Sequence, residues 1–365
     1  MMNRFRLRDV LSLHYGSALP HRNRLPGEFP VFGSGGLAGY HNEPLVRGPG
    51  IIVGRKGSIG SVFLERRGFW PIDTVYYVET RETLVDFRFT YYLLRSLPLA
   101  SMNSDAAVPG LNRDRALDVE VLLPPIRDQR RIAAILSAYD DLIENNTRRI
   151  AILEEIARRI YEDWFVRFRF PGHKGVRMVE SELGLVPEGW LMRLLGDEIE
   201  LAYGKALKAE DRAPGDVPVY GSSGVVGRHA TSLVGGPGII VGRKGNVGSV
   251  HWCDVPFFPI DTVFYVKTAL PLHYIFFNLQ RQNFLNNDAA VPGLNRNQAY
   301  SLPLLVPSRD VLDRFEAESA QLLGLARLLG RKNVNLRATR DLLLPRLISG
   351  ELDVSKLPEP EALAA

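Results

Sequence analysis

A glycine-rich stretch with paired cations occurs twice in the chain. It reads GPGIIVGRKGSIGSV at 48–62 and GPGIIVGRKGNVGSV at 236–250, identical at thirteen of fifteen positions over a separation of 188 residues. A nucleotide-binding P-loop needs four residues between its glycines, followed by Gly-Lys-Ser/Thr, whereas three residues separate Gly50 from Gly54 and Arg55 follows. The stretch instead predicts a strand, a turn with basic residues at its tip, and a second strand.

The tip of each turn is the tetrapeptide GRKG. Glycine allows the backbone to approach a partner closely, and adjacent cations suit phosphate oxygens or the edge of a guanine. The alternative is that the glycines serve the turn and the cations are only solvated. We predict DNA contacts at four residues of the tips: Arg55, Lys56, Arg243 and Lys244.

A second repeated motif is DAAVPGLNR, at 105–113 and 288–296, identical in all nine residues. Its last two residues either reach DNA or form a structural turn before a strand; they are Asn112, Arg113, Asn295 and Arg296. In the repeated PIDTV, Asp73 has no repeated acidic partner, because Glu79 aligns with Lys267. We therefore expect Asp73 and its equivalent Asp261 to bond within their turns rather than to catalyse a reaction.

Few residues are suited to metal binding or catalysis. Of the seven histidines, His41 and His229 are the only pair at equivalent positions, and Cys253 is the single cysteine. Neither pattern has the spacing of a metal site. The Asn-Pro-Pro-aromatic stretch of amino-methyltransferases is also absent. We expect a non-catalytic protein without a metal ion or a cofactor of its own.

Composition is that of a globular protein: 365 residues, 45% hydrophobic and 24% charged. The N-terminal MMNRFRLRDVLSLHYGS lacks the apolar core of a signal peptide, and no run approaches the roughly 18 apolar residues of a spanning helix. We expect a soluble cytoplasmic protein that does not contact a membrane. A net charge of +4 is a weak electrostatic argument for nucleic acid, so DNA binding would depend on local clusters.

The repeat extends well beyond the loops and predicts two similar domains. YGSAL at 15–19 aligns with YGKAL at 203–207, and GEFPVFGSGGLAGYH at 27–41 with GDVPVYGSSGVVGRH at 215–229. Short β-branched runs between glycines favour strands, and FRFTYYLLRSLPL and LHYIFFNLQRQNFL have helical spacing. We predict the α+β class, with two mixed α/β domains.

Two other segments have apolar residues at alternating spacings of four and three, which is typical of coiled coils. In the first they are Ile132, Leu136, Tyr139, Ile143, Ile150, Leu153, Ala157 and Ile160, with Asn146 in the same seam. In the second the seam positions are Leu312, Phe315, Ser319, Leu322, Ala326, Leu329, Asn333, Leu336 and Leu343, with Arg340 also in the seam. Each helix would be about 50 Å long at 1.5 Å per residue. Antiparallel pairing would relate the two domains by a pseudo-twofold axis and hold them a fixed distance apart. If the domains bind DNA, the target would be bipartite.

Several motifs resemble those of the specificity subunit of type I restriction–modification systems. They are IYEDWFVRFRFPGHKG at 160–175, PEGWLMRLLGDEIELAYGKALKAEDR at 187–212, the GRKG and PIDT frame, and LRATRDLLLPRLISGELDV at 336–354. The resemblance covers nearly the whole chain. It implies target-recognition domains at 1–126 and 171–308, a central helical region at 127–170, a distal helical region at 309–350, and a disordered tail at 351–365.

The resemblance also implies partners. Double-stranded DNA would be read as a bipartite site, and the helices would dock two modification subunits that use S-adenosylmethionine to methylate adenine. Restriction subunits would add ATP-driven translocation and cleavage. The alternatives are a related selector, in a fused methyltransferase–nuclease or an anti-phage system, and a coiled-coil adaptor with no DNA role.

Segments that differ between the two copies are candidates for reading bases. We expect the shared frame to hold phosphates while 41–47 and 64–70, with their equivalents 229–235 and 252–258, read base edges. Serine at position 17 corresponds to lysine at 205. The DNA contacts predicted on this ground are His41, Arg47, Lys205 and His229.

Overall fold

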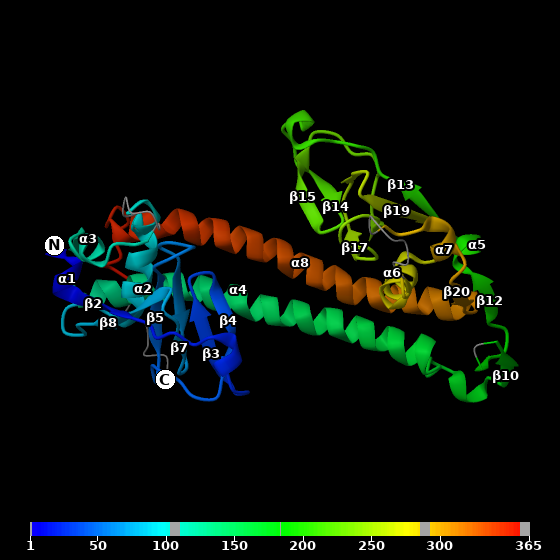
Figure 1. Cartoon of the computed structure of the whole chain (residues 1–365), viewed down its shortest axis with the longest axis horizontal. Helices are drawn as coiled ribbons and strands as arrows, with labels where there is room; N and C mark the ends of the chain where they lie inside the picture. The colour runs from blue at the N-terminus through cyan, green and yellow to red at the C-terminus, as the bar shows by residue number, and fades with distance from the viewer. Residues whose placement is uncertain (1, 103–109, 183, 285–292, 358–365) are drawn as a thin grey trace. The chain divides into compact units, whose positions relative to one another are not determined.

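The computed structural model describes residues 2–102, 110–182, 184–284 and 293–357. The chain divides into two compact units, the first made of residues 1–147 and 331–365 and the second of residues 148–330. Two long helices, α4 (Ile126–Tyr161) and α8 (Arg309–Ile348), each contribute to both units (Figure 1). Each unit therefore contains a mixed α/β domain together with segments of both helices, and not one linear stretch of sequence.

The first unit has a four-stranded sheet in the order β2-β8-β5-β6, a three-stranded sheet β4-β3-β7 and the pair β1-β9. Its strands are β1 (Asn3–Arg6), β2 (Leu11–Tyr15), β3 (Phe29–Gly33), β4 (Gly36–His41), β5 (Gly50–Gly54), β6 (Val62–Glu65), β7 (Trp70–Pro71), β8 (Val75–Thr80) and β9 (Glu120–Leu123). Its short helices are α1 (Leu7–Val10), η1 (His21–Asn23), α2 (Phe87–Ser96), η2 (Leu99–Ser101) and α3 (Arg113–Leu117).

The second unit repeats this topology, with sheets β13-β19-β16-β17 and β15-β14-β18 and the pair β12-β20, and it adds the hairpin β10-β11. Its strands are β10 (Met178–Ser181), β11 (Gly184–Pro187), β12 (Leu191–Leu194), β13 (Ile199–Tyr203), β14 (Val217–Gly221), β15 (Gly224–His229), β16 (Gly238–Gly242), β17 (Val250–Cys253), β18 (Phe258–Pro259), β19 (Val263–Thr268) and β20 (Pro303–Val306). Its shorter helical segments are η3 (Glu162–Val166), η4 (His173–Gly175), α5 (Leu195–Glu198), η5 (Ala209–Asp211), α6 (Leu272–Arg281) and α7 (Arg296–Tyr300).

The core of each unit joins the larger sheet to the long helices. The run GIIVG is completely buried in both copies, as β5 and as β16, because each is an inner strand of its sheet. In the first unit, Phe89 and Tyr92 of α2 share a core cluster with Leu136 of α4 and Leu347 of α8. Helix α2 thus packs between the larger sheet and the long helices of the first unit, and α6 has the same place in the second unit.

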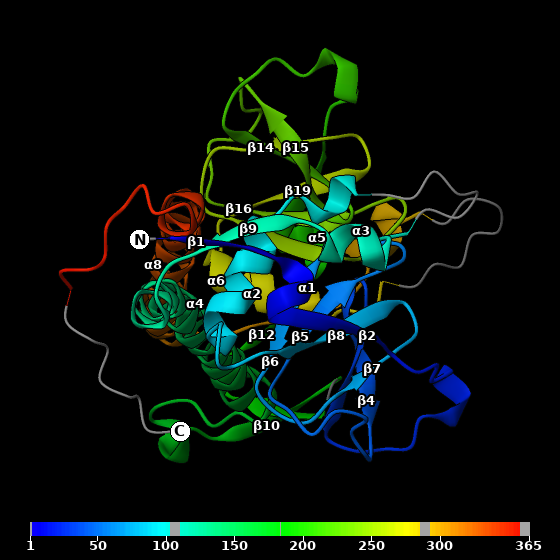
Figure 2. The same cartoon turned by 90° about the vertical axis from the view of Figure 1, so that its left-hand side faces the viewer.

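The two helices pair antiparallel within the first unit, as the coiled-coil spacing predicts. Asp140 of α4 hydrogen-bonds Arg340 of α8, and further along α4 Asn146 donates to Asn333 at 2.9 Å, earlier on α8. Both views place the last turns of α8 beside the first turns of α4 (Figures 1 and 2). The two predicted long helices are confirmed, including the polar residues in their seams.

The tail prediction is wrong for residues 351–357. Val354 is buried in the core of the first unit, and the carbonyl of Ser355 accepts a hydrogen bond at 3.0 Å from Arg131. The apolar residues Leu352 and Val354 give this short segment something to bury, which a charge count of the tail does not reveal. Residues 358–365 lie outside the described residues.

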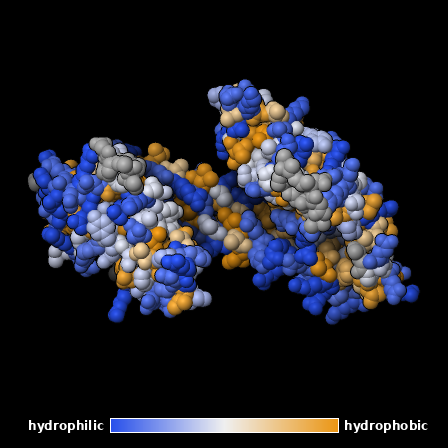
Figure 3. Space-filling view, viewed as in Figure 1, coloured by the Kyte–Doolittle hydropathy of each residue, from blue (hydrophilic) through white to orange (hydrophobic). Residues whose placement is uncertain are grey.

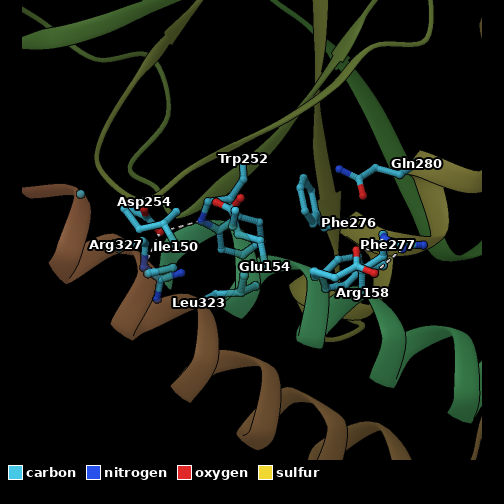
Figure 4. A pocket seen from close by; sticks show the side chains of 14 residues that line it. Ile150, Glu154, Arg158, Trp252, Asp254, Phe276, Phe277, Gln280, Leu323 and Arg327 are labelled. Atoms are coloured by element: carbon cyan, nitrogen blue, oxygen red, sulfur yellow. Dashed lines mark hydrogen bonds and ion pairs between the residues drawn. The ribbon is translucent and has the colours of Figure 1, made fainter. Parts of the chain in front are cut away.

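In each unit an ion pair links the α/β domain to a long helix. The domain supplies the cation in the first unit and the anion in the second. In the first unit Arg66, just after β6, pairs with Asp141 of α4. In the second unit the equivalent position carries Asp254, whose Oδ1 lies 3.1 Å from Nε of Arg327 on α8 (Figure 4). Asp254 also accepts a hydrogen bond from the indole of Trp252 at 2.6 Å.

A hollow of about 660 Å³ next to the second pair is lined by both apolar and charged side chains. The lining includes Trp252 and Phe276, and Trp252 stacks on the buried His273 with ring centroids 4.5 Å apart. Residues 64–70 and 252–258 were predicted to read bases. Three of these residues, Arg66, Trp252 and Asp254, contact helices of their own unit, and base reading by the two segments stays a prediction.

Reversing one partner of the second ion pair is expected to destabilise the protein modestly. The pair is about 70% buried, with side-chain exposures of 28% and 29%, so Arg327→Asp should cost about 1 kcal/mol through loss of the pair and carboxylate repulsion. Adding Asp254→Arg restores opposite charges, in the polarity of the first unit. Thermal unfolding measures both variants, with Arg314→Asp on the same helix as the control. No recovery in the double variant would contradict the proposed role of the pair.

Candidate nucleic-acid interface

The GRKG tips have the predicted conformation. Gly54 ends β5, and a Cβ there would lie 2.2 Å from the carbonyl oxygen of Ser58, so only glycine fits. Gly57 has φ +75°, which is the left-handed region that favours glycine. The second copy repeats both features at Gly242 and Gly245. The turn thereby holds its arginine and lysine at the end of a rigid strand.

In the first unit two arginines flank one tyrosine. The guanidinium carbon of Arg55 lies 4.9 Å from the ring centroid of Tyr15, and that of Arg113 lies 5.5 Å from the same ring. Arg55 is also fixed by a 3.0 Å hydrogen bond to the carbonyl of Asp73, while its backbone N–H bonds the carbonyl of Thr74 at 2.9 Å. We call Tyr15, Arg55 and Arg113 the first stack.

The second unit contains the same arrangement. Arg243 and Arg296 lie 4.9 and 5.1 Å from the ring centroid of Tyr203. Arg243 donates to the carbonyl of Asp261 at 3.2 Å, as Arg55 does to Asp73. We call Tyr203, Arg243 and Arg296 the second stack. In each stack the aspartate of PIDT acts through its backbone carbonyl, which agrees with the structural role expected for it.

Both central tyrosines are half exposed, at 51% for Tyr15 and 48% for Tyr203. Guanidinium groups over an aromatic face are held flat by cation–π attraction and leave their N–H groups free to bind anions. A hollow of about 280 Å³ surrounds the first stack and is also lined by Lys56, Tyr76, Asn112 and Asp114. This arrangement suits phosphate oxygens and base edges.

Tyr76, which lies next to Tyr15 of the first stack, keeps its hydroxyl protonated at neutral pH. Burial, with a smaller contribution from neighbouring Tyr15, raises the pKa of Tyr76 to about 12. Its hydroxyl donates to the carbonyl of Leu111 at 3.1 Å, which ties the start of the LNR segment to β8. The second unit has Phe264 at the equivalent position, within 5.8 Å of Arg243. The hydroxyl is therefore structural.

The asparagines of the repeated LNR begin short helices. Asn112 is the N-cap of α3 and accepts from the backbone N–H of Arg115 at 3.0 Å, and Asn295 caps α7 in the same manner. The side-chain oxygens of both asparagines therefore have a structural role as helix caps. The arginines that follow them join the stacks. Residues 105–109 and 288–292 of the repeated motif lie outside the described residues.

The two equivalent histidines hold loops. His41 is 5% exposed and its Nδ1 accepts from the backbone N–H of Leu25 at 3.0 Å, which gives it a structural role, and its DNA contact stays a prediction. His229 is half-buried and bonds Ala213 in the same way. Arg47 and Lys205 are exposed, and their DNA contacts, like that of His229, stay predictions.

Sequence reasoning missed the tyrosines of both stacks. A signal for them was present, since Tyr15 and Tyr203 begin the repeated YGSAL and YGKAL, but the motif was used only to align the copies. Within the described ranges, no group of three or more His, Cys, Asp or Glu residues is arranged to hold a metal ion. No helix in this part of the chain is long and apolar enough to cross a membrane.

The chain is similar to known proteins in sequence and in fold. A family model described as the type I restriction modification DNA specificity domain matches residues 2–155. The type I restriction enzyme MjaIX specificity subunit of Methanocaldococcus jannaschii is 31% identical over 121 residues, which are 32% of this chain and 28% of that protein. The MjaVIII specificity subunit of the same organism is 26% identical over 171 residues, 46% of this chain and 39% of that protein. The chain thus aligns with less than half the length of each.

A solved structure agrees over almost the full length. The type I restriction–modification S subunit from M. genitalium has a TM-score of 0.65 at 18% identity, covering 95% of this chain and 96% of that one. At this identity the likeness establishes the fold. Residues 2–155 therefore match the type I restriction modification DNA specificity domain, and the chain has the fold of a solved type I S subunit.

Proposed function

We propose that this chain selects the DNA sequence for a type I restriction–modification complex. Each stack contacts one half of a bipartite double-stranded site, and the chain itself catalyses no reaction. The observation that carries the proposal is the recurrence of the Arg-Tyr-Arg stack, with the same partners and nearly the same distances, in both units. Two equivalent cationic sites in one chain fit a target with two similar halves.

The partners in this proposal supply the chemistry. Two modification subunits bind S-adenosylmethionine and methylate adenine, and restriction subunits add ATP-driven cleavage. Exposed apolar side chains on the long helices support docking of partner subunits; they include Leu142, Ile152, Leu328, Val334 and Leu342. Apolar residues are also visible over β15, where Val225 and Val226 are exposed (Figure 3).

Removing one arginine from a stack is expected to lower the affinity for DNA and also to make that affinity less dependent on salt concentration. Arg243→Ala removes a fixed guanidinium without touching the core. If it contacts one phosphate, the slope of log K against log salt should fall by about 1, with similar losses for all sequences. The measurement is a gel shift with the chain assembled on its modification subunits, at several salt concentrations.

Arg314→Ala on α8 is the matched control, because it removes the same charge from an exposed helix position. It should leave the slope unchanged. Equal slopes for Arg243→Ala and the wild type would remove the second stack from the interface. Failure of the wild-type assembly to prefer any DNA sequence would overturn the proposed function as a whole.

A further inference from the structure

The two stacks are built from identical residues, so the stacks alone cannot distinguish one half-site from the other. Among the described residues that line the first hollow, seven have identical counterparts in the second copy: Tyr15, Arg55, Lys56, Gly110, Leu111, Asn112 and Arg113. The other two differ. Tyr76 corresponds to Phe264, and Asp114 corresponds to Asn297.

Only one of these differences is accessible to DNA. Tyr76 is 1% exposed, and its hydroxyl is occupied by the carbonyl of Leu111. Asp114 is the second residue of α3, and its side chain is 79% exposed at the rim of the hollow. Its Oδ1 lies 3.7 Å from Nε of Arg113, so its carboxylate sits beside a member of the stack.

Asn297 has the same place in the second unit. It is the second residue of α7, directly after Arg296 of the second stack, and it is exposed. The backbone N–H of Asn297 donates to the cap residue Asn295 at 2.9 Å, which leaves its side-chain amide outside the capping bond. Both side chains are therefore short, exposed and held by a capped helix next to a fixed arginine.

The two groups have different hydrogen-bonding chemistry. A carboxylate only accepts, so in the major groove it suits the N4 amino group of cytosine, and it repels phosphate. An amide donates and accepts, and it pairs with N6 and N7 of adenine. Because its charge repels phosphate, the exposed Asp114 carboxylate is better suited to a base edge than to the DNA backbone.

We propose that Asp114 and Asn297 are specificity-determining residues that read one base pair in each half-site, an amino group of cytosine in the first and adenine in the second. The proposal rests on the proposed function of the chain as a DNA selector. The arginines of each stack then hold the backbone, and the neighbouring residue on the short helix supplies the sequence preference.

Exchange of the two groups tests the proposal. The chain carrying Asp114→Asn, assembled with its modification subunits, is used to select DNA from a library randomised in both half-sites. We expect the preferred base at one position of the first half-site to change from cytosine to adenine, by on the order of tenfold to a hundredfold, with the second half-site unchanged. Asn297→Asp should produce the reciprocal change in the second half-site.

Glu82→Gln is the control, an exposed acidic residue of the first unit whose substitution changes the net charge equally. Asparagine already occupies this place in the second unit, so Asp114→Asn should fold, and its melting temperature verifies this. Unchanged base preference, or a uniform gain in affinity for all sequences, would overturn the inference. If the wild-type assembly selects a split site in the same experiment, the proposed function stands regardless.

Discussion

Replacing Phe315 with alanine is expected to lower the free energy of unfolding of the second unit by about 3–5 kcal/mol. Phe315 lies on α8 and is fully buried. Its ring centroid lies 4.9 Å from that of Phe165 and 5.9 to 6.2 Å from those of Tyr161, Trp164 and Phe277. Alanine would leave a cavity among rigid aromatic rings, which relax poorly into empty space.

Thermal or denaturant unfolding of the full chain measures this effect in the transition assigned to the second unit. Leu325→Ala is the control, because Leu325 lies on the same helix but is 39% exposed, and surface truncations usually stay within about 0.5 kcal/mol. Phe315→Leu keeps most of the volume and should cost less than alanine. Equal losses for Phe315→Ala and Leu325→Ala would show that the aromatic cluster does not hold α8.

The long helices were predictable because their signal is local and periodic. Buried and partly buried residues of α4 and α8 follow the predicted seam, including the polar Asn146, Ser319 and Asn333. Arg340 is also accommodated in the seam, with its side chain 12% exposed, because it pairs with Asp140 on the facing helix. A heptad period is enough to locate the apolar stripe of a helix, but the partner of a buried charge is known only from the fold.

The candidate interface was predicted in part. The arginines of GRKG and LNR were found because both motifs recur, but the sequence separates Arg55 from Arg113 by more than fifty residues and gives no sign that they share Tyr15. Duplication of a residue does not by itself indicate a DNA contact, because scaffold residues are duplicated as readily as contacts, and His41 bonds the backbone of Leu25. A difference between the copies also does not by itself indicate a base contact. Arg66 and Asp254 differ in charge because each pairs with an opposite charge on a long helix.

Substitution of Asn333 by leucine is expected to destabilise the first unit by about 1–3 kcal/mol, although it adds apolar surface to a coiled-coil seam. Asn333 is 3% exposed and accepts from Nδ2 of Asn146 at 2.9 Å. Its own Nδ2 donates to the carbonyl of Ile143 and to Oγ1 of Thr147, each at 3.2 Å. Leucine at 333 would leave the buried amide of Asn146 without its acceptor.

The double variant Asn146→Leu with Asn333→Leu separates stability from specificity. Removing both amides leaves no orphaned group, so thermal unfolding should show stability equal to or above that of the wild type, with a coupling energy of about 0.5–3 kcal/mol in the double-mutant cycle. A polar pair in an otherwise apolar seam fixes the register of two helices, because any shift would bury an unpaired amide. If Asn333→Leu alone is as stable as the double variant, the two amides are not coupled, and the register of α4 against α8 in this unit is set by packing alone.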